Sequence, residues 1–387
     1  MQTKVVLDNK IPYGNGILVG IENKKNWLEV AVTPEALNAP ESLWFCFRLK
    51  FKNRPKTQNR LRLVIKYFYN SLGGLPAEKI NPVTRIAKGD WQRLAAGKTV
   101  PLPDGRADAV WETNIIADSM DFAFCFPYGV PEMDEVVEKS KGYLKKDIIG
   151  ISPEGRDIVR ISNNYGDESA KKPGLYLVAR QHSGETSGSW VLHGFLERLA
   201  ESNTQNMTVW CLPLTNIDGV EKGYYGKDNF PTDINRAWGV PPMRYENLVF
   251  QRDIERWANR SQPLLALDFH SPGGSENEGV YCFLPKNDKE TSDKMSSEWS
   301  ERFKKSIPSE FTSDQFGKVA NYASRWESPS FSYYKFMNRF YKIPALSFEF
   351  PYSRSRERIL EIKNYLEIGA AMADTVLETL KTITEST

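Results

Sequence analysis

The stretch Leu175-Tyr-Leu-Val-Ala-Arg-Gln-His182-Ser-Gly-Glu185 predicts a buried β-strand that ends at a histidine and a glutamate. The turn at Ser183-Gly184 can direct the imidazole of His182 and the carboxylate of Glu185 to one point. Histidine nitrogen and carboxylate oxygen are both zinc ligands, and a catalytic zinc site uses three protein ligands and leaves a fourth position to water. This stretch therefore predicts two ligands of a metal site whose third ligand lies elsewhere in the chain.

Several later apolar runs predict further buried strands. They span residues 209–214, 264–270, 280–284 and 345–350. The runs are nearly continuous rather than alternating, and segments with helical character separate them, among them 190–199, 252–259 and 355–380. Strands that are buried on both faces and separated by helices predict an α/β fold, a sheet flanked by helices. Ligands of such folds bind at the carboxyl ends of the strands.

The chain contains only three histidines, so each can be considered separately. His270 ends the run 264–270 much as His182 follows the first strand, and both imidazoles would therefore lie at one sheet edge. His193 lies inside an amphipathic segment, and we expect it to be an ordinary helix residue. The candidate metal ligands are therefore His182, Glu185 and His270.

The first 127 residues have a different pattern. Short β-rich segments alternate polar with apolar residues, and turn-rich spacers separate them. This pattern predicts an antiparallel β-sandwich. A helix-like segment with early acidic residues begins near Pro131. We therefore expect an N-terminal β-sandwich domain at residues 1–127 and an α/β domain at residues 128–387.

Composition excludes few functions. The 51 basic residues nearly balance the 49 acidic ones, so the net charge of +2 gives no reason to expect nucleic acid or a membrane surface as a partner. No apolar stretch is long enough for a membrane helix. The four cysteines are far apart and lie in apolar runs, which favours buried thiols in a reducing compartment. We expect a cytoplasmic protein.

Short motifs in a fixed order carry a resemblance to a known family. In chain order they are H-x-G-E at His182–Glu185, N-x-D-G-V at Asn216–Val220, D-x-N-R-x-W at Asp233–Trp238, D-x-H at Asp268–His270 and F-E at Phe348–Glu349. With these motifs the chain resembles the zinc carboxypeptidases, and most closely their cytosolic carboxypeptidase branch. The resemblance covers nearly the whole chain, because that branch also carries an N-terminal β-sandwich.

The resemblance implies a mixed sheet flanked by helices and a zinc-dependent metallocarboxypeptidase. One zinc ion would bind to His182, Glu185 and His270, and its water would become acidic enough to supply hydroxide near neutral pH. Glu349 would act as the general base. Asp233 and Asp268 would accept hydrogen bonds from the ligand histidines and so fix their orientation.

The expected substrate is the C-terminal tail of a peptide or protein. Asn235 and Arg236 would bind its free carboxylate through paired hydrogen bonds. The chain departs from the family at two positions: Ile217 replaces a proline, and Gly226 stands where the branch has an arginine that polarises the scissile carbonyl. We expect Lys227, the next residue, to replace that arginine.

Two other functions stay open. The chain could be a zinc-dependent hydrolase of another amide, such as an acyl-amino acid or a non-standard peptide, which the missing arginine favours. It could also be a binding protein that retains zinc without turnover, although the complete set of ligands and base argues against this.

The pocket for the substrate side chain is expected from residues 323–342. Its basic residues fit either an acidic C-terminal residue or a charged helix face, and they are Arg325, Lys335, Arg339 and Lys342. The candidates for the family's tyrosine near the reacting group are Tyr322, Tyr333 and Tyr334. Because proline lowers the cost of a cis peptide bond, we also expect a cis Ser271–Pro272 bond after His270.

Overall fold

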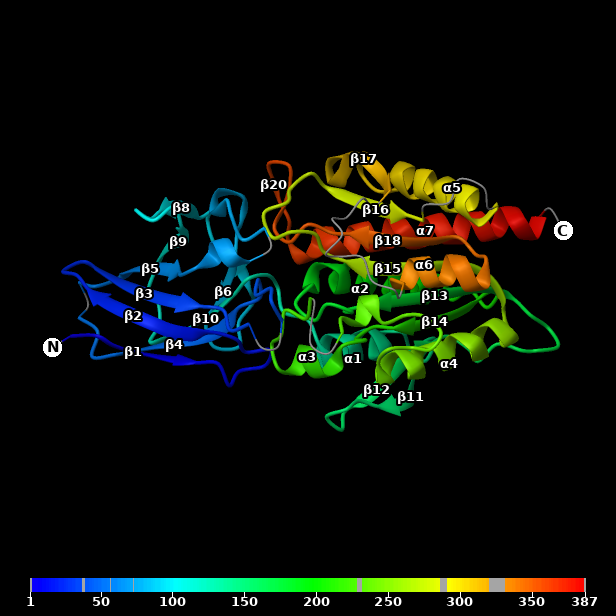
Figure 1. Cartoon of the computed structure of the whole chain (residues 1–387), viewed down its shortest axis with the longest axis horizontal. Helices are drawn as coiled ribbons and strands as arrows, with labels where there is room; N and C mark the ends of the chain where they lie inside the picture. The colour runs from blue at the N-terminus through cyan, green and yellow to red at the C-terminus, as the bar shows by residue number, and fades with distance from the viewer. Residues whose placement is uncertain are drawn as a thin grey trace.

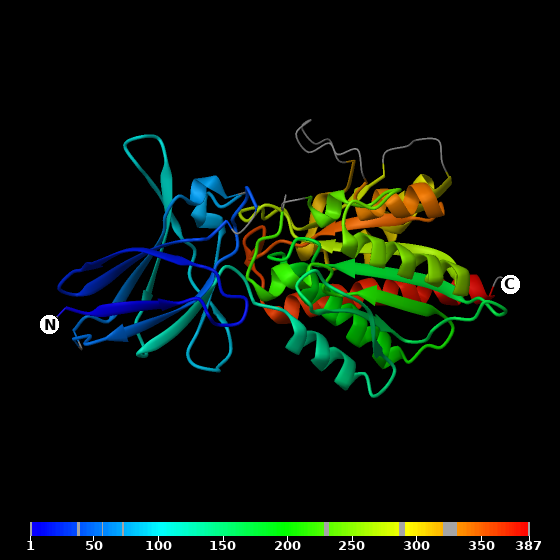
Figure 2. The ribbon, with the colours of Figure 1, turned by 60° about the horizontal axis from the view of Figure 1, so that its bottom comes forward.

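The structure is a computed structural model that describes residues 2–36, 39–55, 57–71, 73–227, 232–285, 291–319 and 331–385. Two sheets built from the N-terminal part of the chain occupy one end of the molecule (Figure 1). A larger sheet with helices on its faces occupies the other end, and the C-terminus lies at the far side of this part (Figure 2).

The N-terminal part consists of two five-stranded sheets. The first contains, in spatial order, β1 (Lys4–Asp8), β4 (Cys46–Lys52), β10 (Ser119–Ala123), β6 (Val83–Arg85) and β7 (Gln92–Arg93). The second contains β2 (Ile17–Asn23), β3 (Trp27–Thr33), β5 (Arg60–Ile65), β9 (Ala107–Asn114) and β8 (Lys98–Pro101). Short 3-10 turns lie at η1 (Phe68–Asn70) and η2 (Ala77–Lys79).

The predicted antiparallel pairing is confirmed for every pair of these strands except β3 and β5, which run parallel. The chain leaves β3 for β4 in the other sheet before it returns to β5, and this crossover permits the parallel pair. Alternate residues of β3 are fully buried, as the sequence alternation predicts. Aromatic side chains such as Phe45, Phe68, Trp111 and Phe124 pack between the sheets.

The larger part is built on an eight-stranded mixed sheet, which confirms the predicted fold class. Its strands are, in spatial order, β11 (Lys145–Ile151), β12 (Asp157–Ser162), β14 (Thr208–Leu212), β13 (Pro173–Ala179), β15 (Gln262–His270), β18 (Ala345–Glu349), β16 (Val280–Leu284) and β17 (Thr312–Val319). The central strands β14, β13, β15 and β18 are parallel to one another. Their carboxyl ends therefore meet at one edge.

Helices cover both faces of this sheet. They are α1 (Val130–Lys139), α2 (Thr186–Ser202), α3 (Ile217–Glu221), α4 (Tyr245–Arg260), α5 (Thr291–Ser306), α6 (Tyr333–Phe336) and α7 (Ile362–Glu385), with short turns η3 (Ile234–Arg236), η4 (Ser309–Phe311) and η6 (Met337–Tyr341). Leu175 and Leu177 of β13 belong to the hydrophobic cluster under α2 and α7. Tyr176 and Val178 belong to the cluster on the opposite face, under α4. β13 is thus buried on both faces, as its continuous apolar run predicts.

Two element boundaries differ from the prediction. The first strand ends at Ala179, because Arg180 has a φ of 62° and turns the chain before His182. The helix expected at 355–380 begins only at Ile362, because β19 (Arg354–Ser355) and β20 (Arg358–Ile359) pair as a small hairpin. The division into two domains near residue 127 stays a prediction, since one hydrophobic cluster extends through both parts of the molecule.

The four cysteines are free and buried. Among the helices of the described residues, none combines the length and apolar composition that crossing a membrane requires.

Candidate metal centre

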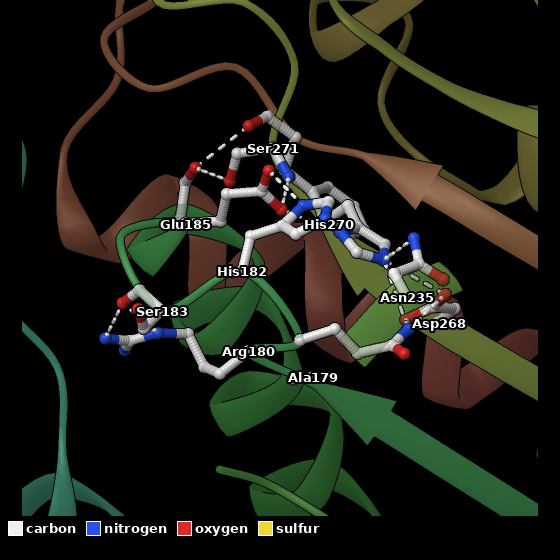
Figure 3. A network of polar contacts seen from close by, with 12 residues as sticks. Ala179, Arg180, His182, Ser183, Glu185, Asn235, Asp268, His270 and Ser271 are labelled. Atoms are coloured by element: carbon white, nitrogen blue, oxygen red, sulfur yellow. Dashed lines mark hydrogen bonds and ion pairs between the residues drawn. The ribbon is translucent and has the colours of Figure 1, made fainter. Parts of the chain in front are cut away.

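Three side chains from two neighbouring strands meet at the carboxyl edge of the large sheet. His182 and Glu185 lie in the turn between β13 and α2, and His270 is the last residue of β15. β13 and β15 are paired in parallel up to Ala179 and Phe269, so both turns begin at the same height (Figure 3). One ligand atom from each of the three residues lies within 4.8 Å of the others, close enough to hold one metal ion.

The carboxylate of Glu185 lies between the two imidazoles. Glu185 Oε1 is 2.7 Å from His182 Nδ1, and Glu185 Oε2 is 2.7 Å from His270 Nδ1. The backbone N–H of Ser271 also donates to Glu185 Oε2, at 3.1 Å. The two Nδ1 atoms and the carboxylate therefore converge on one point (Figure 3).

Each imidazole is held from behind by a second carboxylate. His182 Nε2 lies 3.0 Å from Asp233 Oδ2, and His270 Nε2 lies 3.0 Å from Asp268 Oδ2. Such a contact fixes the ring orientation and directs the other ring nitrogen towards Glu185. In both histidines the nitrogen that remains for a metal is Nδ1.

Charge inside the cluster shifts the pKa of its members. Burial lowers the pKa of His182, but Asp233 and Glu185 outweigh burial and raise it to about 9. Burial is also outweighed at His270, where Asp268 and Glu185 raise the pKa well above its ordinary value. Burial raises the pKa of the Glu185 carboxyl, yet the two histidines hold it below its usual range. The cluster thus favours cations at both imidazoles, and a divalent metal ion would satisfy the same carboxylate.

Gln181 has a place in the site for which sequence reasoning gave no role. Its Nε2 donates to both carboxylate oxygens of Asp268, at 2.9 and 2.8 Å, and its Oε1 accepts from Trp238 Nε1 at 2.7 Å. Gln181 therefore orients the carboxylate that holds His270. The available signal was its position directly before the ligand histidine.

Glu349 is the last residue of β18 and pairs in register with His270 of β15. Its Oε2 atom is shielded from solvent and has no hydrogen-bond partner within the described part of the chain. Burial and the nearby Glu185 raise the pKa of Glu349 to about 8, against the opposing effects of His270 and Lys227. The site therefore contains a carboxyl group that changes protonation near neutral pH.

Asn235 and Arg236 lie on η3, whose first residues are held by Asp233. Asp233 Oδ1 accepts from the N–H of Asn235 at 2.7 Å. The Asn235 side chain is engaged inside the protein, because its Nδ2 lies 3.2 Å from His270 Nε2 and its Oδ1 accepts from Tyr333 N at 3.3 Å. Arg236 is only partly buried, and its Nη1 donates to the carbonyl of Asn235 at 2.9 Å.

The structure separates the two candidate tyrosines that it describes. The hydroxyl of Tyr333 donates to the carbonyl of Tyr176 at 3.1 Å, inside the core. Burial raises the pKa of Tyr334, and the charges that modify this pKa are those of Arg236, Asp268 and Glu349. Its hydroxyl is buried and lacks a hydrogen-bond partner among the described residues.

Part of the region expected to form the side-chain pocket lies outside the described residues, including Tyr322 and Arg325. Lys335 lies on α6, Arg339 on η6 and Lys342 directly after η6. Arg339 and Lys342 are exposed, as on a charged helix face.

His193 lies apart from the metal cluster. It is buried on α2, where its Nδ1 is 3.4 Å from the Tyr128 hydroxyl and its Nε2 is 3.3 Å from Glu197 Oε1. The expected cis Ser271–Pro272 bond is wrong, because the cis bonds within the described ranges are Leu75–Pro76 and Val240–Pro241. The backbone after His270 already donates from Ser271 to Glu185 without a cis bond.

Gly226 and Lys227 belong to a segment that passes beside the metal turn. Gly226 has a φ of 86°, a left-handed conformation that favours glycine. Lys227 is partly buried, and its positive charge acts to lower the pKa of Glu349.

This site and fold define an α/β protein with a buried His-Glu-His cluster that could hold one metal ion. Residues 130–261 match the family described as zinc carboxypeptidase, and zinc is the metal of that family. The resemblance seen in the sequence motifs is therefore confirmed for residues 130–261, which are similar to zinc carboxypeptidases.

Individual relatives agree with this match. Cytosolic carboxypeptidase 6 of Caenorhabditis elegans is 24% identical over 66% of this chain and 59% of its own length. Cytosolic carboxypeptidase 1 of mouse is 27% identical over 42% of this chain but only 15% of its own length. The chain thus spans about three fifths or less of these curated relatives. A crystal structure of a metallo-carboxypeptidase from Burkholderia cenocepacia shares the fold over 99% of this chain and 100% of that one, with a TM-score of 0.79 at 17% identity.

Proposed function

We propose that this chain is a zinc-dependent metallocarboxypeptidase that hydrolyses the C-terminal peptide bond of a peptide or protein tail. The observation that carries the proposal is the Glu185 carboxylate between the Nδ1 atoms of His182 and His270, each 2.7 Å away. Two imidazoles and one carboxylate are a ligand set of catalytic zinc, which leaves a position for water. A cluster built only for stability would have no need of two histidines with the same nitrogen turned inward.

Zinc bound by these three residues would lower the pKa of its water and polarise a carbonyl group. Glu349 is the group that would take a proton from that water and deliver it to the leaving amine. Its pKa near 8 and its Oε2 without a partner in the described ranges both support this role. A general acid and base works best when its pKa is close to the working pH.

Asp233 and Asp268 would hold the ligand histidines in one orientation. Their contacts with the Nε2 atoms, each 3.0 Å long, support this role. Gln181 would in turn fix Asp268 through its two hydrogen bonds. Such outer partners raise the basicity of the histidine and preserve the geometry of the ligand set.

Recognition of the substrate's free carboxylate would fall to Arg236, with Asn235 beside it. Arg236 is partly exposed, and its planar guanidinium can bind a carboxylate through two parallel hydrogen bonds. Asn235 is engaged with His270 and Tyr333, so its part would be to hold η3 and Arg236 in place. The shielded hydroxyl of Tyr334 would be a further donor to the substrate, since Arg236 and Glu349 both affect its pKa.

Lys227 would stabilise the oxyanion that forms at the scissile carbonyl. Its effect on the pKa of Glu349 supports a position near the general base. Lysine supplies the same positive charge as the family's arginine, on a flexible stem.

The substrate would be met in the cytoplasm. The relatives are named as cytosolic enzymes, and the four buried free cysteines agree with a reducing compartment. The near balance of charge gives no support for nucleic acid or a membrane as a partner.

The test compares matched peptides with a free or an amidated C-terminus, incubated with the zinc-loaded chain and followed by mass spectrometry. We expect stepwise loss of C-terminal residues from the free acids only, because Arg236 requires the carboxylate. A chelator should abolish the reaction and zinc should restore it. Cleavage of acyl-amino acids without peptide cleavage would favour the wider amide hydrolase, and bound zinc without any turnover would favour a binding protein. Equal cleavage of amidated peptides would refute the carboxypeptidase proposal.

A further inference from the structure

The segment that carries Lys227 is held between the N-terminal sheets and the metal turn. On the metal side, the Ser183 hydroxyl donates to the carbonyl of Tyr224 at 2.9 Å, and Gly184 N–H donates to the carbonyl of Tyr225 at 2.8 Å. These two hydrogen bonds link the segment to the turn that carries His182 and Glu185. α3, which precedes the segment, lies next to the N-terminal sheets (Figure 1).

On the other side, the segment contacts the turn before β2. Gly223 has a φ of 69°, and a Cβ on it would fall 2.5 Å from the carbonyl oxygen of Gly14. Only a glycine allows the two backbones to approach so closely. The N-terminal part thus rests directly on the start of the Lys227 segment.

Asn15 makes the polar contact across this junction. Its Nδ2 donates to the carbonyl of Gly223 at 2.8 Å, between residues far apart in the chain. Asn15 is 1% exposed, and its Oδ1 accepts from Glu35 N at 2.7 Å. Its backbone also exchanges two hydrogen bonds with Cys46 at the start of β4. Asn15 is therefore fixed within the N-terminal sheets, and its Nδ2 donates one hydrogen bond across the junction to Gly223.

We propose that Asn15 is a positioning residue. It holds the Lys227 segment in the position relative to the metal site that catalysis requires. The inference rests on the proposed role of Lys227. A donor to a backbone carbonyl does not touch substrate, but it affects where the charge of Lys227 lies. A displacement of about 1 Å at such a group can cost ~100-fold in rate. The N-terminal sheets would then be a structural part of the catalytic site.

The test uses Asn15→Asp, which is nearly isosteric. The aspartate keeps an acceptor for Glu35 N but has no donor for Gly223 O, nor for the Glu35 carbonyl, to which Asn15 Nδ2 also donates at 3.0 Å. We expect kcat to fall at least ~10-fold with unchanged KM and unchanged zinc content. Hydrogen exchange in the metal-free chain should also become faster at the amides of Gly184 and Tyr224, whose bonds hold the segment. If Asn15→Asp does not fold, Asn15→Ala removes the amide donors without adding a charge.

Gln58→Glu is the matched control. Gln58 is 3% exposed, and its side chain bonds only within the N-terminal sheets, to Thr3, Asn23, Lys24 and Trp27. It undergoes the same change from amide to acid at a distance from the Lys227 segment. We expect it to lower the melting temperature while leaving kcat and the exchange of Gly184 unchanged.

A double variant separates this inference from the proposed function. If Asn15 acts through Lys227, then Asn15→Asp adds no further loss to Lys227→Ala. Additive losses would overturn the inference, as would an Asn15→Asp protein with normal kcat beside a slow Lys227→Ala protein. A normal kcat in Lys227→Ala alone would instead remove the role of Lys227 and, with it, the inference. A wild type that cleaves no amide would refute the proposed function itself.

Discussion

Gly226 lies so close to Ser183 that a Cβ at position 226 would fall 2.4 Å from Ser183 Oγ and 2.5 Å from the backbone nitrogen of Ser183. Gly226 also has a φ of 86°, which L side chains rarely adopt. The position at which the sequence resemblance expects an arginine is therefore closed to any side chain. Any charge that serves a scissile carbonyl would therefore have to come from another residue, and Lys227 is the adjacent one.

Gly226→Ala should destabilise the protein by more than backbone strain alone. We expect the free energy of unfolding to fall by roughly 2 to 4 kcal/mol, because a clash with a backbone nitrogen is added to a strained φ. Gly105→Ala is the matched control, since Gly105 has a φ of 82° but no neighbour within 4 Å of its Cβ position. Urea unfolding measures both. Equal losses of unfolding free energy in the two variants would show that the Ser183 contact does not matter. Because the position is closed to a side chain, Gly226→Arg should not raise kcat.

Zinc content should depend on His270 and not on His193. Both imidazoles are 2% exposed, so their replacement by alanine disturbs the core to a comparable degree. We expect His270→Ala to lose the zinc and His193→Ala to keep about one ion per chain, because only His270 belongs to the proposed ligand set. Atomic absorption after dialysis measures the content. Full zinc in His270→Ala together with loss in His193→Ala would show that the ligand set is wrong.

Glu349→Gln should keep zinc and lose hydrolysis. The amide preserves the shape of the side chain but cannot accept and return a proton, so we expect kcat to fall by ~100-fold or more. Zinc analysis and peptide turnover are measured on the same preparation. Turnover within threefold of wild type would mean that another group is the base.

Lys227→Ala should lower kcat by ~100-fold and leave the zinc content intact, since stabilising an oxyanion is commonly worth ~2.7 to 4 kcal/mol. Lys222→Ala is the control within the same segment, because Lys222 is exposed and pairs with Glu154. Its kcat should be unchanged. A loss of less than threefold in Lys227→Ala would leave zinc as the main electrophile and favour the wider amide hydrolase.

Zinc binding should release protons at pH 7.5. The pKa of His182 is about 9 and that of His270 is raised, so both imidazoles carry protons in the metal-free site at this pH. Their stabilisation of the metal-free fold is full below pH ~6.5 and is lost as pH rises through about 9. Zinc competes with these protons, so its affinity should rise over the same range. Calorimetry in buffers of different ionisation heat measures the release, and equal apparent heats in all buffers at pH 7.5 would contradict it.

The sequence alone identified the residues of the candidate metal site and the order of the main elements around it. Continuous apolar runs located β13, β14, β15, β16 and β18, because a strand buried on both faces must be apolar on both. His182 and His270 could be paired from sequence because the carboxyl ends of parallel strands share one edge. These features follow from local composition and from the general geometry of sheets.

Only the tertiary structure decided which groups surround those ligands. The contacts of Gln181 with Asp268, of Gly226 with Ser183 and of Asn15 with Gly223 join segments separated in the chain. The parallel pairing of β3 with β5 depends in the same way on how the chain crosses between two sheets. Periodicity and propensity report whether a residue is buried and which backbone shape it favours. They do not report which distant backbone atom comes to lie a few ångströms away, because that depends on how all the elements pack together.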